Sequence, residues 1–358
     1  MSDPIWIRKA EHLGLAQRMP DGAGGSAGWS DIHLIHQALP SIDADMVDTS
    51  TVLLGRQLSL PLVIAGMTGG HPGAVEINRV LARVAEQLDV ALGVGSQRAA
   101  LEHPELSESY SVIRKEAPTA FIIGNIGIGQ IIEYFEEGRI RLYVAKLIDM
   151  VGADALAVHL NYLEEVIQPE GQTRAHGALD ALAAFVDASP VPVIAKETGA
   201  GLSLEVARKL NDVGVSALDV GGRGGTSFAA IEAERSRVRG DSRRSELGAS
   251  LANWGIPTAV SVRACSDILT TIAVGGVRSG VDAAKAIALG AIAAGIGRPL
   301  LVCASEGEDA VRGWLDDFHL QLRSAMFLAG AHKVEELSTV PRVVLGTTGE
   351  WFRQLGLS

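Results

Sequence analysis

The sequence predicts an α/β protein that folds as a single (β/α)8 TIM barrel with an N-terminal extension. Eight short apolar segments recur along the chain, and most are followed by an amphipathic helical pattern. The segments are nearly continuous runs of Val, Ile, Leu and Ala, which is typical of parallel strands covered on both faces. The 358 residues suit one barrel of roughly 250 residues with additions. We expect one domain, with the extension over residues 1–55 and the barrel over residues 56–358.

The expected strands are spaced so that a helix fits after most of them. In chain order they are Leu60–Met67, Ala91–Ser96, Ala120–Ile126, Ala155–Asn161, Val191–Glu197, Ala217–Gly222, Thr271–Val277 and Ala291–Gly297. Amphipathic stretches between them predict helices, for example at Pro72–Leu88, Leu202–Val213 and Gly280–Leu289. An open doubly wound sheet alternates in the same way, and the count of eight favours the closed barrel.

Three segments stand apart from this alternation. Pro20–Gly28 is rich in Gly and predicts a mobile loop, whereas Trp29–Leu39 is expected to form strands that cover the floor or the mouth of the barrel. Gly222–Trp254 is longer than an ordinary strand-to-helix connection, and such segments are usually functional or disordered. It is also rich in arginine, with Arg223, Arg235, Arg237, Arg239, Arg243 and Arg244.

Composition argues against several classes of protein. The sequence shows no signal-peptide pattern and no apolar run of the roughly 20 residues that a membrane span needs, so we expect a cytoplasmic protein that does not bind membranes. Cys265 and Cys303 lie among apolar neighbours, which favours buried thiols over a disulfide or a zinc site. The net charge of −11 argues against a nucleic-acid partner, because neutralising phosphates takes an excess of Lys and Arg.

Chemically capable residues stand where the expected strands end. In a barrel these positions converge on one face, where the loops after the strands build the active site. The residues are Met67-Thr68-Gly69-Gly70, Ser96-Gln97-Arg98, Asn125, His159 to Asn161, Lys196-Glu197, Gly221-Gly222 and Gly275-Gly276.

Two glycine clusters predict a phosphate site after the last two strands. They are Val274-Gly275-Gly276-Val277-Arg278-Ser279-Gly280 and Ala294-Gly295-Ile296-Gly297-Arg298. Unshielded backbone amides and a helix N-terminus bind anions, and barrels commonly place phosphate there. Lys196 ends strand five, where a cation either faces the N1 and O2 edge of a flavin or forms a Schiff base. The paired glycine clusters and the Met-Thr-Gly-Gly turn favour the flavin.

Motifs spread from residue 8 to about residue 300 make the similarity specific. They are Arg8-Lys9-Ala10-Glu11-His12, Met67-Thr68-Gly69-Gly70, Gly95-Ser96-Gln97-Arg98, His159-Leu160-Asn161, Gln168-Pro169-Glu170-Gly171, Lys196-Glu197, Gly222-Arg223-Gly224-Gly225-Thr226, Ile231-Glu232 and Gly275-Gly276. In this order they resemble type 2 isopentenyl diphosphate isomerase. That family consists of FMN-dependent barrels that interconvert isopentenyl and dimethylallyl diphosphate with Mg²⁺ and a reduced flavin, usually generated with NADPH. The resemblance implies a homo-oligomer, a tetramer or larger.

The resemblance also implies roles for individual residues. FMN would contact Ala65, Met67, Thr68, Ser96, Asn125, Lys196, Thr226, Gly275, Gly276, Arg278, Ala294 and Gly295. The prenyl diphosphate substrate would be held by Arg8, Lys9, His12, Arg98, His159 and Asn161, with Glu165 as the Mg²⁺ ligand. Charge-assisted bonds from cations suit a diphosphate, and Mg²⁺ prefers a carboxylate with phosphate oxygens. Because Arg8 and Lys9 are close to the terminus, we expect them to arrive on a lid or from a neighbouring subunit.

The implied reaction is a 1,3-proton shift without net redox change. Protonation of the terminal alkene carbon creates a tertiary cation, which an anionic reduced flavin would stabilise. The proton then leaves C2. The family uses flavin N5 with a Gln at the end of strand four, and the catalytic candidates here are Glu164, Glu232 and His159.

Two positions depart from the family pattern. Glu164 stands where the family has Gln, and Gln172 stands where it has Asp. A carboxylate beside Glu165, a diphosphate and an anionic flavin adds a like charge, so we expect Glu164 to hold its proton longer than usual. An ordinary isomerase with a tolerated substitution and a relative acting on another prenyl or allylic diphosphate both fit. An FMN oxidoreductase of the 2-hydroxy-acid oxidase type and a non-catalytic flavoprotein are the alternatives from other classes.

Overall fold

Eight parallel strands close into a barrel in the computed structural model, which describes residues 5–18 and 24–357. The strands pair in chain order, and β11 closes the ring on β4. Each strand matches one predicted segment, although β6 ends one residue later and β10 begins one residue earlier. They are β4 (Leu62–Ile64), β5 (Ala91–Gly93), β6 (Ile122–Gly127), β7 (Ala155–Leu160), β8 (Val193–Glu197), β9 (Ala217–Asp219), β10 (Thr270–Val274) and β11 (Ala293–Ile296).

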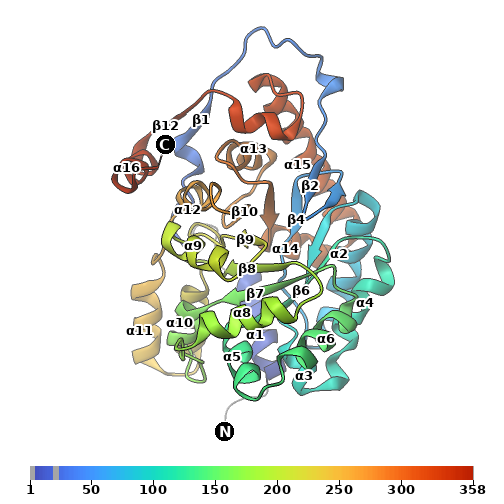
Figure 1. Ribbon diagram of the computed structural model, residues 1–358, viewed down its shortest axis with the longest axis vertical. Helices are drawn as coiled ribbons and strands as arrows, with labels where there is room; N and C mark the ends of the chain where they lie inside the picture. The colour runs from blue at the N-terminus through green and yellow to red at the C-terminus, as the bar shows by residue number, and fades with distance from the viewer. Residues whose placement is uncertain (1–4, 19–23, 358) are drawn as a thin grey trace.

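Helices surround the strands, as Figure 1 shows. The three helices predicted by periodicity are present as α2 (Ala74–Leu88), α9 (Leu204–Asp212) and α13 (Gly280–Ala288). Ser203 and Ser279 cap α9 and α13, because each side chain accepts a hydrogen bond from a backbone N–H of the first turn. Other helices around the strands are α5 (Ile128–Glu136), α6 (Ile140–Val151), α8 (Ala178–Ala188), α12 (Thr258–Cys265), α14 (Arg298–Glu306) and α15 (Glu308–Ala329).

A hairpin that spans the expected boundary between extension and barrel covers the barrel floor, and the sequence did not reveal it. Strands β2 (Thr51–Leu53) and β3 (Arg56–Leu58) pair antiparallel. Leu53 and Leu58 are fully buried against residues from the amino ends of the barrel strands, among them Val63 and Ala155. These side chains therefore close the end of the barrel opposite to the carboxyl ends of the strands.

The predicted strand in 29–39 exists, but it covers neither the floor nor the mouth. β1 (Ile32–Leu34) pairs with β12 (Arg342–Val344) near the other end of the chain and packs against α13, at the top of Figure 1 beside α16 (Gly346–Leu355). In the predicted Gly-rich loop, residues 20–23 lie outside the described residues. Ala27 of this loop is buried, and it packs against Gly224.

The long arginine-rich segment forms a helical hairpin. Its helices are α10 (Phe228–Val238) and α11 (Ser242–Leu251), which pack against each other and against α7 (Tyr162–Ile167). Ser227 and Asp241 cap them by accepting hydrogen bonds from backbone N–H groups. The segment is therefore ordered and stands beside the loop that follows β7.

Within the described part of the chain, no helix combines the length and apolarity that crossing a membrane requires. Both cysteines are free thiols, as expected. Cys265 is buried, and burial raises the pKa of its thiol to about 12. Cys303 is only half-buried, so the expectation of two buried thiols is wrong for this residue.

The hairpin plug generates a stability prediction. Leu53→Ala removes a fully buried side chain and should lower the free energy of unfolding by about 2–5 kcal/mol. Val52→Ala is the matched control, because Val52 is on the same strand and 51% exposed; it should change stability by less than about 0.5 kcal/mol. Urea denaturation measures both. Equal losses of unfolding free energy in the two variants would contradict the role of Leu53 in closing the barrel floor.

Candidate active site

One cavity of about 310 Å³ opens at the carboxyl ends of the barrel strands. Such a volume and position are typical of small-molecule sites in barrel enzymes. All the predicted site residues line it except two, so the structure brings together Arg8, Lys9, His12, Ala65, Met67, Thr68, Ser96, Arg98, Asn125, His159, Asn161, Glu164, Glu165, Lys196, Thr226, Gly275, Gly276, Arg278 and Gly295.

The two exceptions are Ala294 and Glu232, neither of which is among the described residues that line the cavity. Ala294 is fully buried in the core around the barrel, while its neighbour Gly295 reaches the cavity. Glu232 is also fully buried. Its Oε1 lies 2.5 Å from His12 Nε2 and accepts a hydrogen bond from Gln168 Nε2 at 3.0 Å. The Glu232 carboxylate therefore stands behind two residues that do line the cavity.

The two glycine clusters form a backbone cradle. Gly275 and Gly276 have φ of 118° and 69°, which side chains rarely adopt, and a Cβ on Gly276 would come within 2.4 Å of the Gly224 carbonyl oxygen. A Cβ at Gly297 would make only ordinary van der Waals contact, 3.6 Å from the Met67 sulfur, and Gly297 also lines the cavity. The N-terminal ends of α13 and α14 adjoin these loops, and helix N-termini attract anions. In α13, Gln321 and Ser279 already accept hydrogen bonds from the backbone N–H groups of Gly280 and Asp282.

Lys196 forms a nearly buried ion pair that the sequence analysis missed. Its Nζ lies 3.1 Å from Oδ2 of Asp219, which ends β9, and the two side chains are 12% and 11% exposed. Asp219 Oδ1 also accepts a hydrogen bond from the Gly221 backbone N–H. Burial raises the pKa of Asp219, and the Lys196 charge opposes that rise. Asp219 thus fixes the ammonium group at the cavity wall. In the sequence, Asp219 stands directly before Val220-Gly221-Gly222, at the end of a predicted strand, and this position could have marked it as a site residue.

His159 is an uncharged residue in this site. Burial, followed by the charges of Lys196 and other cations, lowers its pKa to about 3. Its Nδ1 lies 2.9 Å from Oδ1 of Asn125, whose amide donates to the Val94 carbonyl. At neutral pH the His159 imidazole is therefore neutral and offers hydrogen bonding without a charge.

Helix α1 (Ile5–Arg18) brings three basic residues to the cavity from the same chain. It packs against α10 and α14, and Arg298 Nε donates to the Ala16 carbonyl at 2.6 Å. Lys9 Nζ donates to the Ser96 carbonyl at 2.7 Å and to the Tyr110 hydroxyl at 3.0 Å. Burial and the neighbouring Arg8 and Arg98 lower the Lys9 pKa to about 7. A neighbouring subunit is therefore not needed to supply these groups.

Glu164 lines the cavity on α7, where Gln168 Nε2 donates to its Oε1 at 2.8 Å. The pKa of Glu164 is raised, as expected, but the main cause is burial; Glu232 and Glu165 raise it less. The same Gln168 amide donates to Glu232, and its carbonyl oxygen accepts from Arg8 at 3.3 Å. Gln168 was named only as part of a motif, and the structure makes it the link between Glu164, Glu232 and Arg8.

Glu165 is held by two donors, Asn161 Nδ2 at 2.9 Å and the Gln172 backbone N–H at 2.6 Å. The Gln172 side chain donates to Glu133 at 2.6 Å and accepts from Gln130. An Asp at position 172 has no group that could donate to Glu133. The Gln172 amide therefore suits the neighbouring Glu133 carboxylate better than the Asp of the family pattern would. The closest group of metal-ligand atoms in the described residues is a different one, His12, Glu164 and Glu232, within 4.8 Å of one another.

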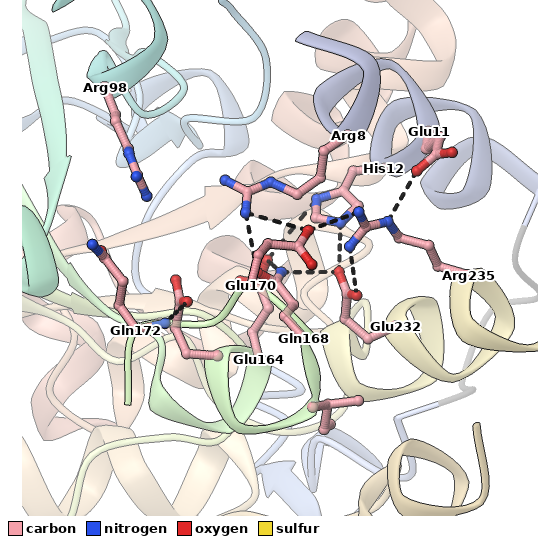
Figure 2. A network of polar contacts seen from close by, with 12 residues as sticks. Arg8, Glu11, His12, Arg98, Glu164, Gln168, Glu170, Gln172, Glu232 and Arg235 are labelled. Atoms are coloured by element: carbon pink, nitrogen blue, oxygen red, sulfur yellow. Dashed lines mark hydrogen bonds and ion pairs between the residues drawn. The ribbon is translucent and has the colours of Figure 1, made fainter. Parts of the chain in front are cut away.

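Figure 2 shows how these polar side chains converge from α1, from the segment after β7 and from α10. Arg235 is 3% exposed and binds Glu11, Glu170 and Glu232 at 2.9, 2.7 and 3.1 Å. Burial raises the pKa of Glu232, but the hydrogen bond and charge of His12 and the charge of Arg235 outweigh it, so the pKa lies below its ordinary value. The sequence analysis named Arg235 without giving it a role.

Comparison with known proteins identifies the class of barrel. Residues 159–342 match the family model described as FMN-dependent dehydrogenase. The fold agrees with that class. A mandelate oxidase variant carrying an FMN adduct superimposes with a TM-score of 0.62 over 93% of this chain and 95% of its own, at 21% identity. This structural likeness shows the shared barrel.

Curated relatives define the family more narrowly. The isopentenyl-diphosphate delta-isomerase of Methanothermobacter thermautotrophicus is 47% identical over 98% of this chain and 96% of its own length. The protein of the same name from Halobacterium salinarum is 45% identical over 97% of this chain and 96% of its own. The chain belongs to the isopentenyl-diphosphate delta-isomerase family and is an isomerase, which confirms the resemblance inferred from the sequence motifs.

The Lys196–Asp219 pair generates a double-mutant prediction. Lys196→Met leaves a buried carboxylate without its partner and should lower the free energy of unfolding by about 3–5 kcal/mol. Adding Asp219→Asn removes the unpaired charge and should restore most of that loss. Thermal and urea unfolding of the two variants measure the effect. Parental stability in Lys196→Met would show that the pair contributes nothing to the fold, and a double variant as unstable as the single one would show that the unpaired carboxylate is not the cause of the loss.

Proposed function

We propose that the protein is an FMN-dependent isomerase that interconverts isopentenyl and dimethylallyl diphosphate by a 1,3-proton shift, with Mg²⁺ and a flavin reduced by NADPH. One observation carries the proposal: a single cavity joins the glycine cradle and Lys196 to the cations Arg8, Lys9 and Arg98. The first set suits a flavin phosphate and ring, and the second suits a diphosphate. The curated relatives are named for isopentenyl diphosphate, which supports the second set, and the matching family model is named for FMN, which supports the first.

FMN fits the donor set on one side of the cavity. Gly275, Gly276 and Gly297 would receive its phosphate at the N-terminal ends of α13 and α14, and Lys196 would face the N1 edge of the ring. Arg278 supports the cradle, since its Nη2 donates to the Gly224 carbonyl at 3.1 Å. When bound and reduced, the flavin would supply a negative charge close to the substrate alkene.

The substrate diphosphate fits the other side. Arg8 and Lys9 from α1 and Arg98 from α3 (Arg98–Glu102) line the cavity, and Figure 2 shows Arg98 across the space from Arg8. Glu165 would hold Mg²⁺, because carboxylate with phosphate oxygens is the ligand set that Mg²⁺ prefers. Asn161 and the Gln172 backbone N–H orient that carboxylate.

The carboxylate of Glu164 supports a second candidate, a relative that acts on another prenyl or allylic diphosphate. Glu164 lies at the cavity wall where the family has an amide, and Gln168 holds its Oε1. Gln at position 164 has almost the same shape and can still accept that hydrogen bond through its carbonyl oxygen, but it loses the one that Glu164 Oε2 accepts from Asn161 Nδ2 at 3.2 Å. Glu164→Gln therefore changes the charge of the site while it preserves the shape.

Solvent exchange tests both candidates. The reduced protein, incubated with isopentenyl diphosphate and Mg²⁺ in D₂O, should yield dimethylallyl diphosphate with deuterium in the new methyl group, seen by NMR. In an ordinary isomerase, Glu164→Gln should keep or raise this rate, because it removes a like charge from beside the diphosphate.

Two outcomes would contradict these expectations. Absence of deuterium and of product from the parent protein would sink the isopentenyl isomerase proposal. A Glu164→Gln variant that loses activity on another prenyl diphosphate, which the parent does convert, would favour the second candidate.

Lys9 gives the proposed diphosphate site a pH dependence. The groups that act on it or contact it are Arg8, Arg98, Glu102, Glu164, Tyr110, His71 and His159. The Lys9 pKa of about 7 must rise when an anion binds. The affinity for diphosphate should therefore be highest below pH 7 and fall as the pH rises above 7, by up to about tenfold per pH unit. Calorimetric titration with inorganic diphosphate from pH 6 to 9 measures this slope.

Lys9→Arg is the matched control for this slope. Arginine stays charged throughout the range, so its profile should be flatter above pH 7. His159 does not contribute to the slope, since its pKa of about 3 keeps it neutral. Parallel profiles for the parent and Lys9→Arg would contradict the role of Lys9.

A further inference from the structure

The strongest unexplained feature is a buried guanidinium that joins three segments of the chain. Arg235 Nε donates to Glu11 of α1 at 2.9 Å, and its Nη2 donates to Glu170 of the segment after β7 at 2.7 Å. Its Nη1 donates to Glu232, one turn earlier on α10, at 3.1 Å. A buried charge is costly unless it is fully paired. Here each of the three edges of the planar Arg235 guanidinium faces a carboxylate.

Each partner of Arg235 connects to a residue at the cavity. Glu232 uses Oε2 for Arg235, which leaves Oε1 for His12 and for Gln168. Glu170 Oε1 is also 3.7 Å from Arg8 Nη1. Glu11 lies on the same helix as Arg8 and His12, and Arg239 binds it from the far side. The guanidinium thus sits directly behind the groups assigned to the diphosphate.

The charge of Arg235 affects three carboxylates close to the cavity. Glu11, Glu170 and Glu232 each have a pKa below the ordinary value even though burial opposes this. Arg239 and then Arg235 offset the burial for Glu11, Arg235 does so for Glu170, and His12 and then Arg235 do so for Glu232. Without Arg235, Glu170 and Glu232 would each lose a cationic partner behind the diphosphate site, while Glu11 would keep Arg239, and Glu170 would hold Arg8 more strongly. Both effects weaken anion binding, and neither requires Arg235 to touch the ligand.

We propose that Arg235 is a positioning residue that docks α1 over the cavity and neutralises Glu11, Glu170 and Glu232, so that Arg8 and His12 remain available to the substrate diphosphate. The proposal rests on the proposed function for the identity of the anion. Lysine cannot replace this arginine, because a point charge cannot bind carboxylates along three edges of a plane.

The test measures affinity for inorganic diphosphate with Mg²⁺, by calorimetry on the full chain supplied with FMN. Arg235→Met should raise the Kd at least about tenfold, and Arg235→Lys should raise it several-fold. Arg237→Met is the matched control, since Arg237 is on the same helix, 66% exposed and paired with Glu234; its Kd should stay within about twofold of the parent value. FMN content should stay unchanged in all three, because no residue assigned to FMN contacts Arg235.

A rescue separates this role from general stability. In the Arg235→Met background, Glu170→Gln removes the uncompensated carboxylate near Arg8 and should recover part of the diphosphate affinity. With isopentenyl diphosphate as substrate, KM should rise more than kcat falls.

An unchanged Kd in Arg235→Met, or the same change in Arg237→Met, would overturn the proposal. If Arg235→Met does not fold, Arg235→Lys decides, and parental affinity in that variant overturns it as well. A parent protein that binds diphosphate without isomerising isopentenyl diphosphate overturns the proposed function alone.

Discussion

Parallel pairing around a closed ring is the constraint on which the rest of this structure depends. Once β11 pairs with β4, every strand points the same way, and the carboxyl ends of all strands meet at one mouth. Residues far apart in sequence, such as Met67, His159 and Gly275, therefore line one cavity. The other end needs a plug, which Leu53 and Leu58 of the hairpin supply. Stability and ligand binding are thus assigned to opposite ends of the same barrel.

Electrostatic pairing organises the mouth once the barrel has formed it. Several cations line the cavity, and two of them are strongly influenced by their surroundings. Asp219 pairs with Lys196, and burial with the neighbouring Arg8 and Arg98 lowers the pKa of Lys9. Buried carboxylates behind α1 are matched in turn by Arg235. Such pairing is required because unpaired charges in a poorly solvated site either lose their charge or destabilise the fold.

The two departures from the family pattern have different physical settings. Gln172 is explained by its surroundings, since its amide donates to Glu133 and accepts from Gln130 while its backbone supports Glu165. Glu164 accepts hydrogen bonds at both oxygens, from Gln168 at Oε1 and from Asn161 at Oε2, whereas an amide could accept at only one of them. The charge at position 164 is therefore the feature of this chain that bears most directly on its chemistry.

The sequence by itself determined the eight strands and the main helices, and nearly all the residues that it assigned to the site do line the cavity. Apolar runs and strand-end motifs are local signals, and the direction of parallel strands converts them into one site. The sequence did not determine which side chains pair across that site. The roles of Asp219, Gln168 and Arg235, the neutral state of His159 and the position of Glu232 behind His12 depend on distances and burial that only the tertiary structure sets. A hydrogen bond or a pKa shift is fixed by neighbours within a few ångströms, and those neighbours lie up to about 220 positions away along the chain.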